Sequence, residues 1–161
     1  MRHLLRALVF LAFAAPALAQ ERAAQPPIAG VWKLNPEKSN VRLPEGAIEI
    51  RQYMMRSDGF LVGLLFTGSQ QAGYRFLQFT AKSDGKDYPE YSEPIVSEMI
   101  AKGTPTPRTY SETLDDEYTT DWTDKVNGRV TGHGKKIVSK DGRTLTITVD
   151  GSPQVRIYDR Q

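Results

Sequence analysis

Apolar and polar residues alternate in short runs along most of the chain, and the clearest run lies near the C-terminus. Between positions 143 and 149 threonines share one face of an extended chain, and the other face holds Leu145, Ile147 and Val149. A period of two residues predicts a strand with one face in a core and the other in water. Asp-Gly pairs at 141–142 and 150–151 favour tight hairpin turns at both ends, because glycine adopts positive φ readily.

Similar runs, each cut by a turn, fill the chain from position 30 onward and predict about eight to ten strands. Weaker strands are predicted over IVSEMIAKG (95–103) and RTYSETL (108–114), and in the last strand Val155 and Ile157 are expected to face inward. Because the turns are short, strands adjacent in sequence should pair. This favours an all-β fold, an antiparallel up-and-down β-barrel of the lipocalin-like kind, with a β-sandwich as the alternative.

The run FLVGLLF at Phe60–Phe66 is apolar on both faces, unlike an ordinary barrel strand. Its outer face should therefore be covered, either by the N-terminal lead-in or by another subunit. The sequence predicts a homodimer through this strand as one arrangement, because exposed apolar patches mark interfaces.

The first 20 residues carry the pattern of a secretory signal peptide. A cationic start precedes an apolar run at 4–15, and Ala-Leu-Ala at 17–19 places small residues two apart before Gln20. This pattern predicts cleavage after Ala19 and export to the periplasm or beyond the cell. The apolar run is too short to cross about 30 Å of hydrocarbon, so no transmembrane span is expected after signal removal. Gln20 and the lack of cysteine exclude a lipoprotein anchor.

The predicted organisation is a signal peptide at 1–19, a flexible lead-in at 20–28 and one barrel domain at 29–161. The full chain has 21 Lys and Arg against 19 Asp and Glu, and loss of Arg2 and Arg6 with the signal leaves 19 of each. Nucleic-acid-binding domains normally carry a basic excess, so neither nucleic acid nor an anionic membrane surface is expected as a partner. The chain has 0 Cys, which excludes disulfides, thiolate zinc sites and thiol nucleophiles.

The stretch GVWKLNPEKSN at 30–40 places Gly30 and Trp32 on an apolar run that Asn-Pro then ends. A Gly-x-Trp on the first strand resembles the opening of the lipocalin-like barrels. The resemblance implies that Trp32 plugs the closed end and that a basic side chain from the last strand, Arg160 or else Arg156, covers the indole. Such a cation–π contact contributes up to about 2 kcal/mol when desolvated. The alternative is an ordinary core tryptophan.

Three stretches, GVWKLNPEKSN, FTAKSDGKDYP and VSKDGRTLTITVDG, resemble in this order a family of uncharacterised exported bacterial proteins with the pattern GxWKLNxxKS, DGKDYP and VSKDGKTLT. The resemblance extends from Gly30 to Tyr158. It departs over PEGAIEIRQYMMRSDGFLVGLLFTG, which is more apolar than the family pattern. The resemblance implies a lipocalin-like barrel and export, and it implies no activity.

Candidate catalytic chemistry is sparse. His133 is the one histidine that remains after the predicted cleavage, and it is interpreted either as a surface strand residue or as a general base. One histidine without cysteine disfavours a zinc site, and the chain has no GxSxG, phosphate loop or HExxH motif. The sequence therefore predicts no catalytic residue, no metal site and no cofactor.

Aromatic residues supply the walls of a pocket inside the predicted barrel. The candidate ligand-binding residues are Tyr53, Tyr74, Phe76, Tyr118 and Trp122. A barrel of about eight strands can hold one small ligand, and pockets for drug-sized ligands start at about 300 Å³. The sequence favours a binding protein for a small apolar or amphipathic molecule whose cavity exceeds that volume. The alternatives are a structural or protein-interaction module with a filled core and a barrel enzyme of unknown reaction.

Overall fold

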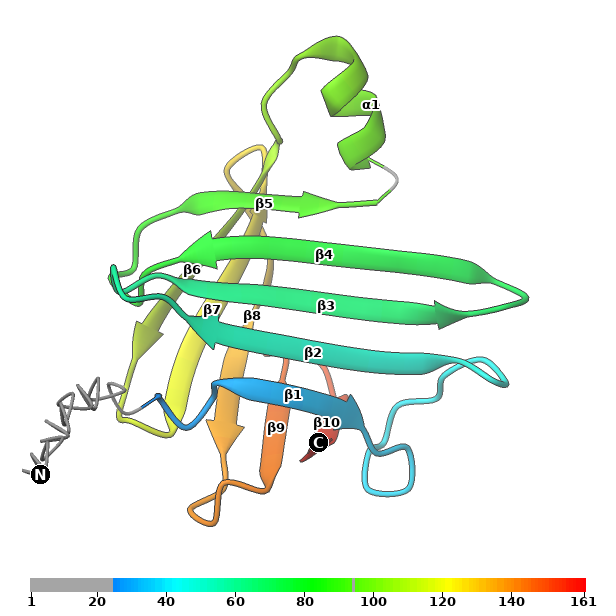
Figure 1. Cartoon of the computed structure of the whole chain (residues 1–161), viewed down its shortest axis with the longest axis vertical. Helices are drawn as coiled ribbons and strands as arrows, with labels where there is room; N and C mark the ends of the chain where they lie inside the picture. Colours follow the sequence, from blue (N-terminus) through cyan, green and yellow to red (C-terminus); the bar gives the residue numbers. More distant parts are fainter. Residues whose placement is uncertain (1–24, 94) are drawn as a thin grey trace, which may run out of the picture.

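Most connections between neighbouring strands are short, and the last strand returns to the first, so the chain closes on itself as a ring. In this computed structural model, which describes residues 25–93 and 95–161, ten strands form a closed antiparallel barrel (Figure 1). Each strand pairs with its neighbour in sequence, and β1 also pairs with β10. The strands are β1 (Gly30–Leu34), β2 (Ile48–Met55), β3 (Leu61–Ser69), β4 (Gly73–Ala81), β5 (Tyr88–Ser92), β6 (Arg108–Leu114), β7 (Thr119–Val126), β8 (Arg129–Val138), β9 (Thr144–Thr148) and β10 (Val155–Arg160). The predicted up-and-down barrel is confirmed, and the sandwich alternative is not adopted.

The barrel is flattened into two layers whose strands cross. In Figure 1, β1 to β5 run across the front, and β6 to β9 pass steeply behind them. In the front layer Ile50, Phe66 and Phe76 are direct neighbours on β2, β3 and β4. In the rear layer the register shifts between Asp124 and Lys125, because β8 has one extra residue, Thr131, that forms a bulge opposite them. The lumen lies between these layers.

The hairpin between β7 and β8 shows why the turn residues matter. Asn127 has φ 50° and Gly128 has φ 75°. A two-residue type I′ turn requires positive φ at both positions, and its twist matches that of the flanking strands. Asn-Gly is the pair that adopts this geometry at least cost, so β7 and β8 join in a two-residue hairpin.

The strand predicted over 95–103 is wrong, because these residues form helix α1 (Ile95–Lys102). Apolar residues recur there at 95, 96, 99 and 100, which is helical spacing and not the alternation of a strand. Gly103 follows with φ 61°, the left-handed conformation that ends many helices. Figure 1 shows α1 beyond the sheet, in the connection from β5 to β6. The strand predicted over 108–114 is confirmed as β6.

Residues of β1, β9 and β10 form one part of the buried core. Trp32, Leu145 and Tyr158 are each 0% exposed, and Ile147 is 4% exposed. The predicted inward face of residues 145 and 147 is therefore confirmed. The prediction for the last strand is wrong, since Arg156 and Tyr158 face inward and Ile157, on the opposite side, is only half-buried. Alternation fixes this outcome, because residues two apart share a face.

Charged side chains also enter the barrel. Glu49, Glu90, Glu112 and Lys136 are each between 1% and 6% exposed. Such groups are seldom fully buried unless they are paired. The lumen is therefore a polar interior as well as an apolar one, and the pairing of these charges defines the candidate site.

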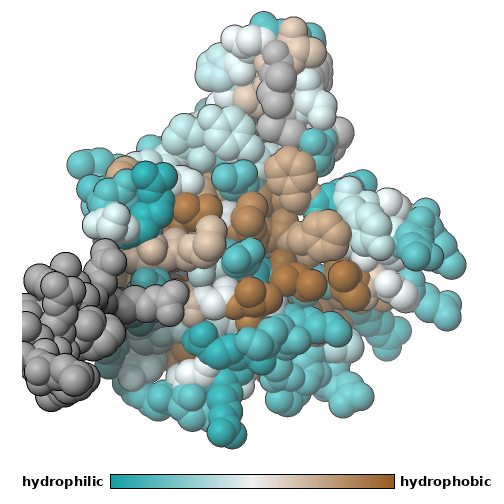
Figure 2. Space-filling view, in the orientation of Figure 1, coloured by the Kyte–Doolittle hydropathy of each residue, from teal (hydrophilic) through white to brown (hydrophobic). Residues whose placement is uncertain are grey.

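The outer face of the front layer is apolar. Phe66 is 37% exposed and Tyr74 is 52% exposed, and their rings stack with centroids 5.0 Å apart. Figure 2 shows apolar side chains gathered over β2 to β4 on this face. On β3 the inward position 63 must be glycine, because a Cβ there would lie 2.3 Å from the ring of Phe79. The two-sided apolar character of Phe60–Phe66 thus divides into a core face and an exposed face.

The predicted signal peptide at 1–19 lies outside the described residues, as does the first part of the lead-in at 20–28. Within residues 25–93 and 95–161, no helix has the length and apolar character needed to cross a bilayer. Export remains a prediction from the sequence.

Candidate functional site

A cavity of about 220 Å³ lies in the lumen between the two layers. At about 30 Å³ for each molecule of liquid water, this volume equals roughly seven waters. Its apolar lining consists of Leu65, Leu77, Phe79, Ile147 and Val149. Its charged lining consists of Glu49, Arg51, Glu90, Asp124, Lys136 and Arg156. The expected volume above about 300 Å³ is not reached. The space suits a small molecule with polar groups and does not suit a drug-sized apolar one.

The structure separates the five predicted ligand-binding residues. Tyr53 and Trp122 line the cavity. Tyr74 and Phe76 point outward, because Leu77 and Phe79 occupy the inward positions of β4. Tyr118 precedes β7 and packs against the core away from the cavity, with Lys140 Nζ 3.8 Å from its ring centroid. Strand parity therefore corrects the placement of Tyr74 and Phe76.

A cationic group of residues lies on β2 and β10. Arg51 Nε donates to the hydroxyl of Tyr158 at 2.8 Å, and that hydroxyl donates to Glu49. Arg51 Nη2 and Arg156 Nε each lie 3.8 Å from Glu49 Oε1. This distance is longer than a hydrogen bond. Two guanidinium groups thus share one carboxylate, and Arg51 Nη1 also donates to the hydroxyl of Tyr53 at 3.4 Å. Both arginine side chains line the cavity, where their N–H groups can meet an acceptor.

Lys136 lies at the centre of a separate buried group. Its Nζ is 2.7 Å from Glu112 Oε2 and donates to the hydroxyl of Tyr110 at 2.5 Å. The rings of Tyr53, Phe79 and Tyr110 surround this ammonium at 5.1 to 5.5 Å. Burial alone would raise the pKa of Glu112, but the ammonium outweighs burial and holds this pKa below its ordinary value. This ion pair neutralises itself within the fold.

An acidic pair lies on the opposite side of the lumen. Glu90 is 1% exposed, and its Oε1 accepts a hydrogen bond from Arg108 Nε at 2.5 Å. Burial, and then the charge of Asp124, raises the pKa of Glu90 to about 7. Burial also raises the pKa of Asp124. Two ionised carboxylates repel each other, so near neutral pH this pair shares one proton.

Two buried polar side-chain atoms in the described residues have no hydrogen-bond partner, and both line this cavity. They are Glu90 Oε2 and Trp122 Nε1. The proton that Glu90 shares with Asp124 gives this carboxyl a hydrogen bond, so Trp122 Nε1 is the donor that is left without a partner among the described residues. Leaving such a group without any partner costs about 1–3 kcal/mol, which an ordered water or a bound molecule can remove. The cavity therefore offers the Trp122 N–H as a donor, and it offers Glu90 as an acceptor once the pair has lost its proton.

The structure brings together Gly30, Trp32 and Arg160. The Arg160 guanidinium carbon lies 4.1 Å from the centroid of the Trp32 ring, and its Nη1 donates to the carbonyl of Ala29 at 2.7 Å. A Cβ at Gly30 would lie 2.5 Å from that Nη1, so glycine is required there. Arg156, the other candidate, faces the cavity instead. Whether this arrangement holds the barrel end together remains a prediction.

His133 lies on the outer surface, where its Nδ1 is 2.7 Å from Asp150 Oδ2. It shares a shallow surface groove with Ser111 and Thr123 and does not line the lumen. In the described part of the chain no group of three or more His, Asp or Glu side chains could hold a metal ion.

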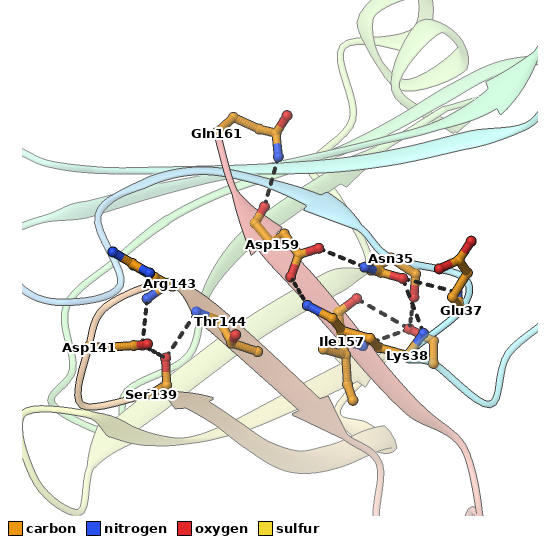
Figure 3. Close-up of polar contacts among 11 residues, drawn as sticks. Asn35, Glu37, Lys38, Ser139, Asp141, Arg143, Thr144, Ile157, Asp159 and Gln161 are labelled. Carbon is orange, nitrogen blue, oxygen red and sulfur yellow. Dashed lines mark hydrogen bonds and ion pairs between the residues drawn. The ribbon is translucent and has the colours of Figure 1, made fainter.

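The stretch at 35–39 is fixed to β10 by side-chain hydrogen bonds (Figure 3). Asn35 Nδ2 donates to Asp159 Oδ2 at 2.7 Å, and Lys38 Nζ lies 2.8 Å from Asp159 Oδ1. The Ser39 hydroxyl accepts a hydrogen bond from the N–H of Ile157 at 2.8 Å. These residues therefore hold the connection that leaves β1 against the last strand.

The stretch SKDGR at 139–143, which is also part of the family resemblance, forms a turn between β8 and β9 that side-chain hydrogen bonds hold in place. Asp141 Oδ1 accepts hydrogen bonds from the Ser139 hydroxyl at 2.6 Å and from the N–H of Arg143 at 3.0 Å (Figure 3).

No protein-family model and no curated protein matches this chain. The charged residues of the cavity lie outside all three resembling stretches. The resemblance therefore gives no information on these charged residues.

Sequence reasoning missed Glu49, Arg51, Glu90, Asp124 and Lys136. One signal was available for the last strand. Arg160 was expected to cover the Trp32 ring, and strand residues two apart share a face. If Arg160 faces inward with Trp32, then Arg156 and Tyr158 face inward as well, in place of the predicted Val155 and Ile157.

Proposed function

We propose that this protein is an exported binding protein that holds one small amphipathic molecule inside its barrel. The observation that supports this most strongly is the position of Trp122 Nε1, a buried donor that lacks a partner among the described residues and lines the same cavity as the carboxyl pair of Glu90 and Asp124. A ligand with an acceptor for this N–H would remove the penalty of leaving it unpaired.

The lining of the cavity favours an amphipathic ligand over a purely apolar one. Aliphatic side chains such as Leu65 and Val149 would contact its apolar part. Placing only hydrocarbon beside Arg51 and Asp124 would leave charges without solvation, which is unfavourable. The volume of about 220 Å³ limits the ligand to a small molecule. Export and membership of the resembling family are part of the proposal, supported by the pattern at 1–19 and by the three quoted stretches.

Native mass spectrometry of the protein isolated from its own host tests the proposal. We expect a folded species whose mass exceeds that of the chain by one bound small molecule.

The apolar outer face supports a second candidate function, self-association through β3. Residues of β2, β3 and β4 extend the patch around Phe66, which is 37% exposed. A twofold axis would place this face against its copy, as in most homodimers. We expect light scattering after size-exclusion chromatography to give a dimer mass, and Phe66→Lys to give a monomer. Leu114→Lys, at a residue 57% exposed on β6, should leave the dimer intact. A monomeric wild-type protein at high micromolar concentration contradicts this candidate.

A further inference from the structure

The charges of the cavity are distributed over two facing walls. In the ring of described strands β1 lies between β2 and β10, and β6 lies between β5 and β7. Since β1 and β6 are half a circuit apart, side chains from their neighbours face each other across the lumen. Arg51 and Arg156 enter from β2 and β10, and Glu90 and Asp124 enter from β5 and β7.

On the cationic wall the two positive charges of Arg51 and Arg156 exceed the single negative charge of Glu49. Arg51 and Arg156 both approach Glu49, at 3.8 Å each. Tyr158 already donates to the same carboxylate. Guanidinium groups carry five donors in a planar fork that matches a carboxylate, so an acidic group of a ligand would fit between the two arginines.

The acidic wall has the opposite character. Glu90 and Asp124 have one guanidinium, that of Arg108, within ion-pair distance of Glu90. The more distant charges that act on this pair are those of Arg51 on β2 and Lys136 on β8. Lys136 is already neutralised by Glu112 at 2.7 Å. A cation placed beside the pair would let both carboxyls ionise and would replace the shared proton as their hydrogen-bond donor.

We propose that the ligand is a small zwitterion whose acidic group binds Arg51 and Arg156 and whose amino group binds Glu90 and Asp124. A short hydrocarbon chain between these groups would contact Leu65 and Leu77 in the apolar lining. This inference rests on the proposed function, that the lumen is a binding site. No covalent step is involved.

The amino group and a proton compete for the acidic pair. Because the pKa of Glu90 is about 7, the pair gives up its shared proton between about pH 6 and pH 8. Aliphatic ω-amino acids keep both their charges over this range. A zwitterion should therefore bind more tightly as the pH rises, while an acid without an amino group should gain nothing.

Isothermal titration calorimetry with matched probes tests the inference. The probes are 4-aminobutyrate, 6-aminohexanoate and 8-aminooctanoate, each compared with the unsubstituted acid and the primary amine of equal chain length. At pH 8 we expect at least one zwitterion to bind about tenfold more tightly than its matched acid, and we expect that ratio to fall by at least about threefold at pH 6.

Glu90→Gln provides the matched variant, because glutamine has the shape of a protonated glutamate and its carbonyl can still accept from Arg108. It should remove the preference for the zwitterion and its pH dependence, and leave the affinity for the plain acid within about twofold. A ratio below about twofold for all three pairs in the wild-type protein overturns the inference, and this result does not depend on the folding of any variant. If the acids bind equally well, or another molecule is found by mass spectrometry, the proposed function stands while the zwitterion inference fails.

Discussion

Replacement of Glu112 by alanine is expected to lower the free energy of unfolding by about 3–5 kcal/mol, because it leaves the Lys136 ammonium buried without its counter-charge. Lys136 is 3% exposed, and the Tyr110 hydroxyl would be its remaining close partner among the described residues. Urea denaturation at pH 7 measures the loss. The double variant Glu112→Leu with Lys136→Met should recover most of it, since removal of both charges leaves no unpaired ion.

The neighbouring residue supplies the control. Lys135 points to the outer surface and pairs with Asp115 at 2.5 Å, with both side chains more than 40% exposed. Asp115→Ala should cost no more than about 1 kcal/mol, because solvent screens exposed ion pairs. Equal losses for Asp115→Ala and Glu112→Ala would show that the lumen ion pair has no special role.

The same ion pair predicts a dependence on pH. The folded-state pKa of Glu112 is held below its ordinary value, so the stabilisation is complete above the unfolded pKa of about 4.3. It is lost as the pH falls through the lower, folded-state pKa. The difference in stability between the wild-type protein and Glu112→Ala should therefore shrink below about pH 4 and stay constant above about pH 5.

Trp32→Ala is the second large effect, with an expected loss of about 3–5 kcal/mol from the cavity left by a fully buried indole. Trp32 is 0% exposed, and its Nε1 donates to the carbonyl of Ile28 at 2.8 Å. If Arg160 stabilises the barrel end through this ring, Arg160→Ala should cost less in the Trp32→Ala background than in the wild-type protein. Chemical denaturation of the four proteins gives a coupling of up to about 2 kcal/mol. Additive losses would make Trp32 an ordinary core residue.

Much of the fold could be predicted because its rules are local. Asp-Gly and Asn-Gly turns and the alternation of Leu145 and Ile147 each depend on a few neighbouring residues. Short turns then force sequential pairing, and closure follows from the need to pair the edge strands. Helix α1 was missed because short apolar runs can be read with either period.

The candidate site could not be predicted, because the rule that apolar residues face inward fails in the lumen. On β2 the apolar residues Ile48 and Met54 are 36% and 46% exposed, whereas Glu49, which directly follows Ile48, is 6% exposed. Which of these side chains face inward depends on contacts with residues far away in the sequence, such as the hydrogen bond from Tyr158 to Glu49. The sequence shows that Glu49 lies between Ile48 and Ile50, but it does not show which of these side chains faces the lumen. The charges that pair with Glu49 can be identified only from the closed barrel.

If the lumen holds a small molecule, native mass spectrometry of the protein isolated from its own host should detect that molecule on the folded chain. Leu77→Trp fills the cavity from the inner face of β4, and Gln78→Trp places the same ring on the outer face of the same strand. Circular dichroism and thermal unfolding establish that both variants fold. We expect one small-molecule adduct on the wild-type protein and on Gln78→Trp, and we expect none on Leu77→Trp. A wild-type protein without an adduct, or an adduct that persists in folded Leu77→Trp, would contradict the proposal that the lumen holds a small molecule.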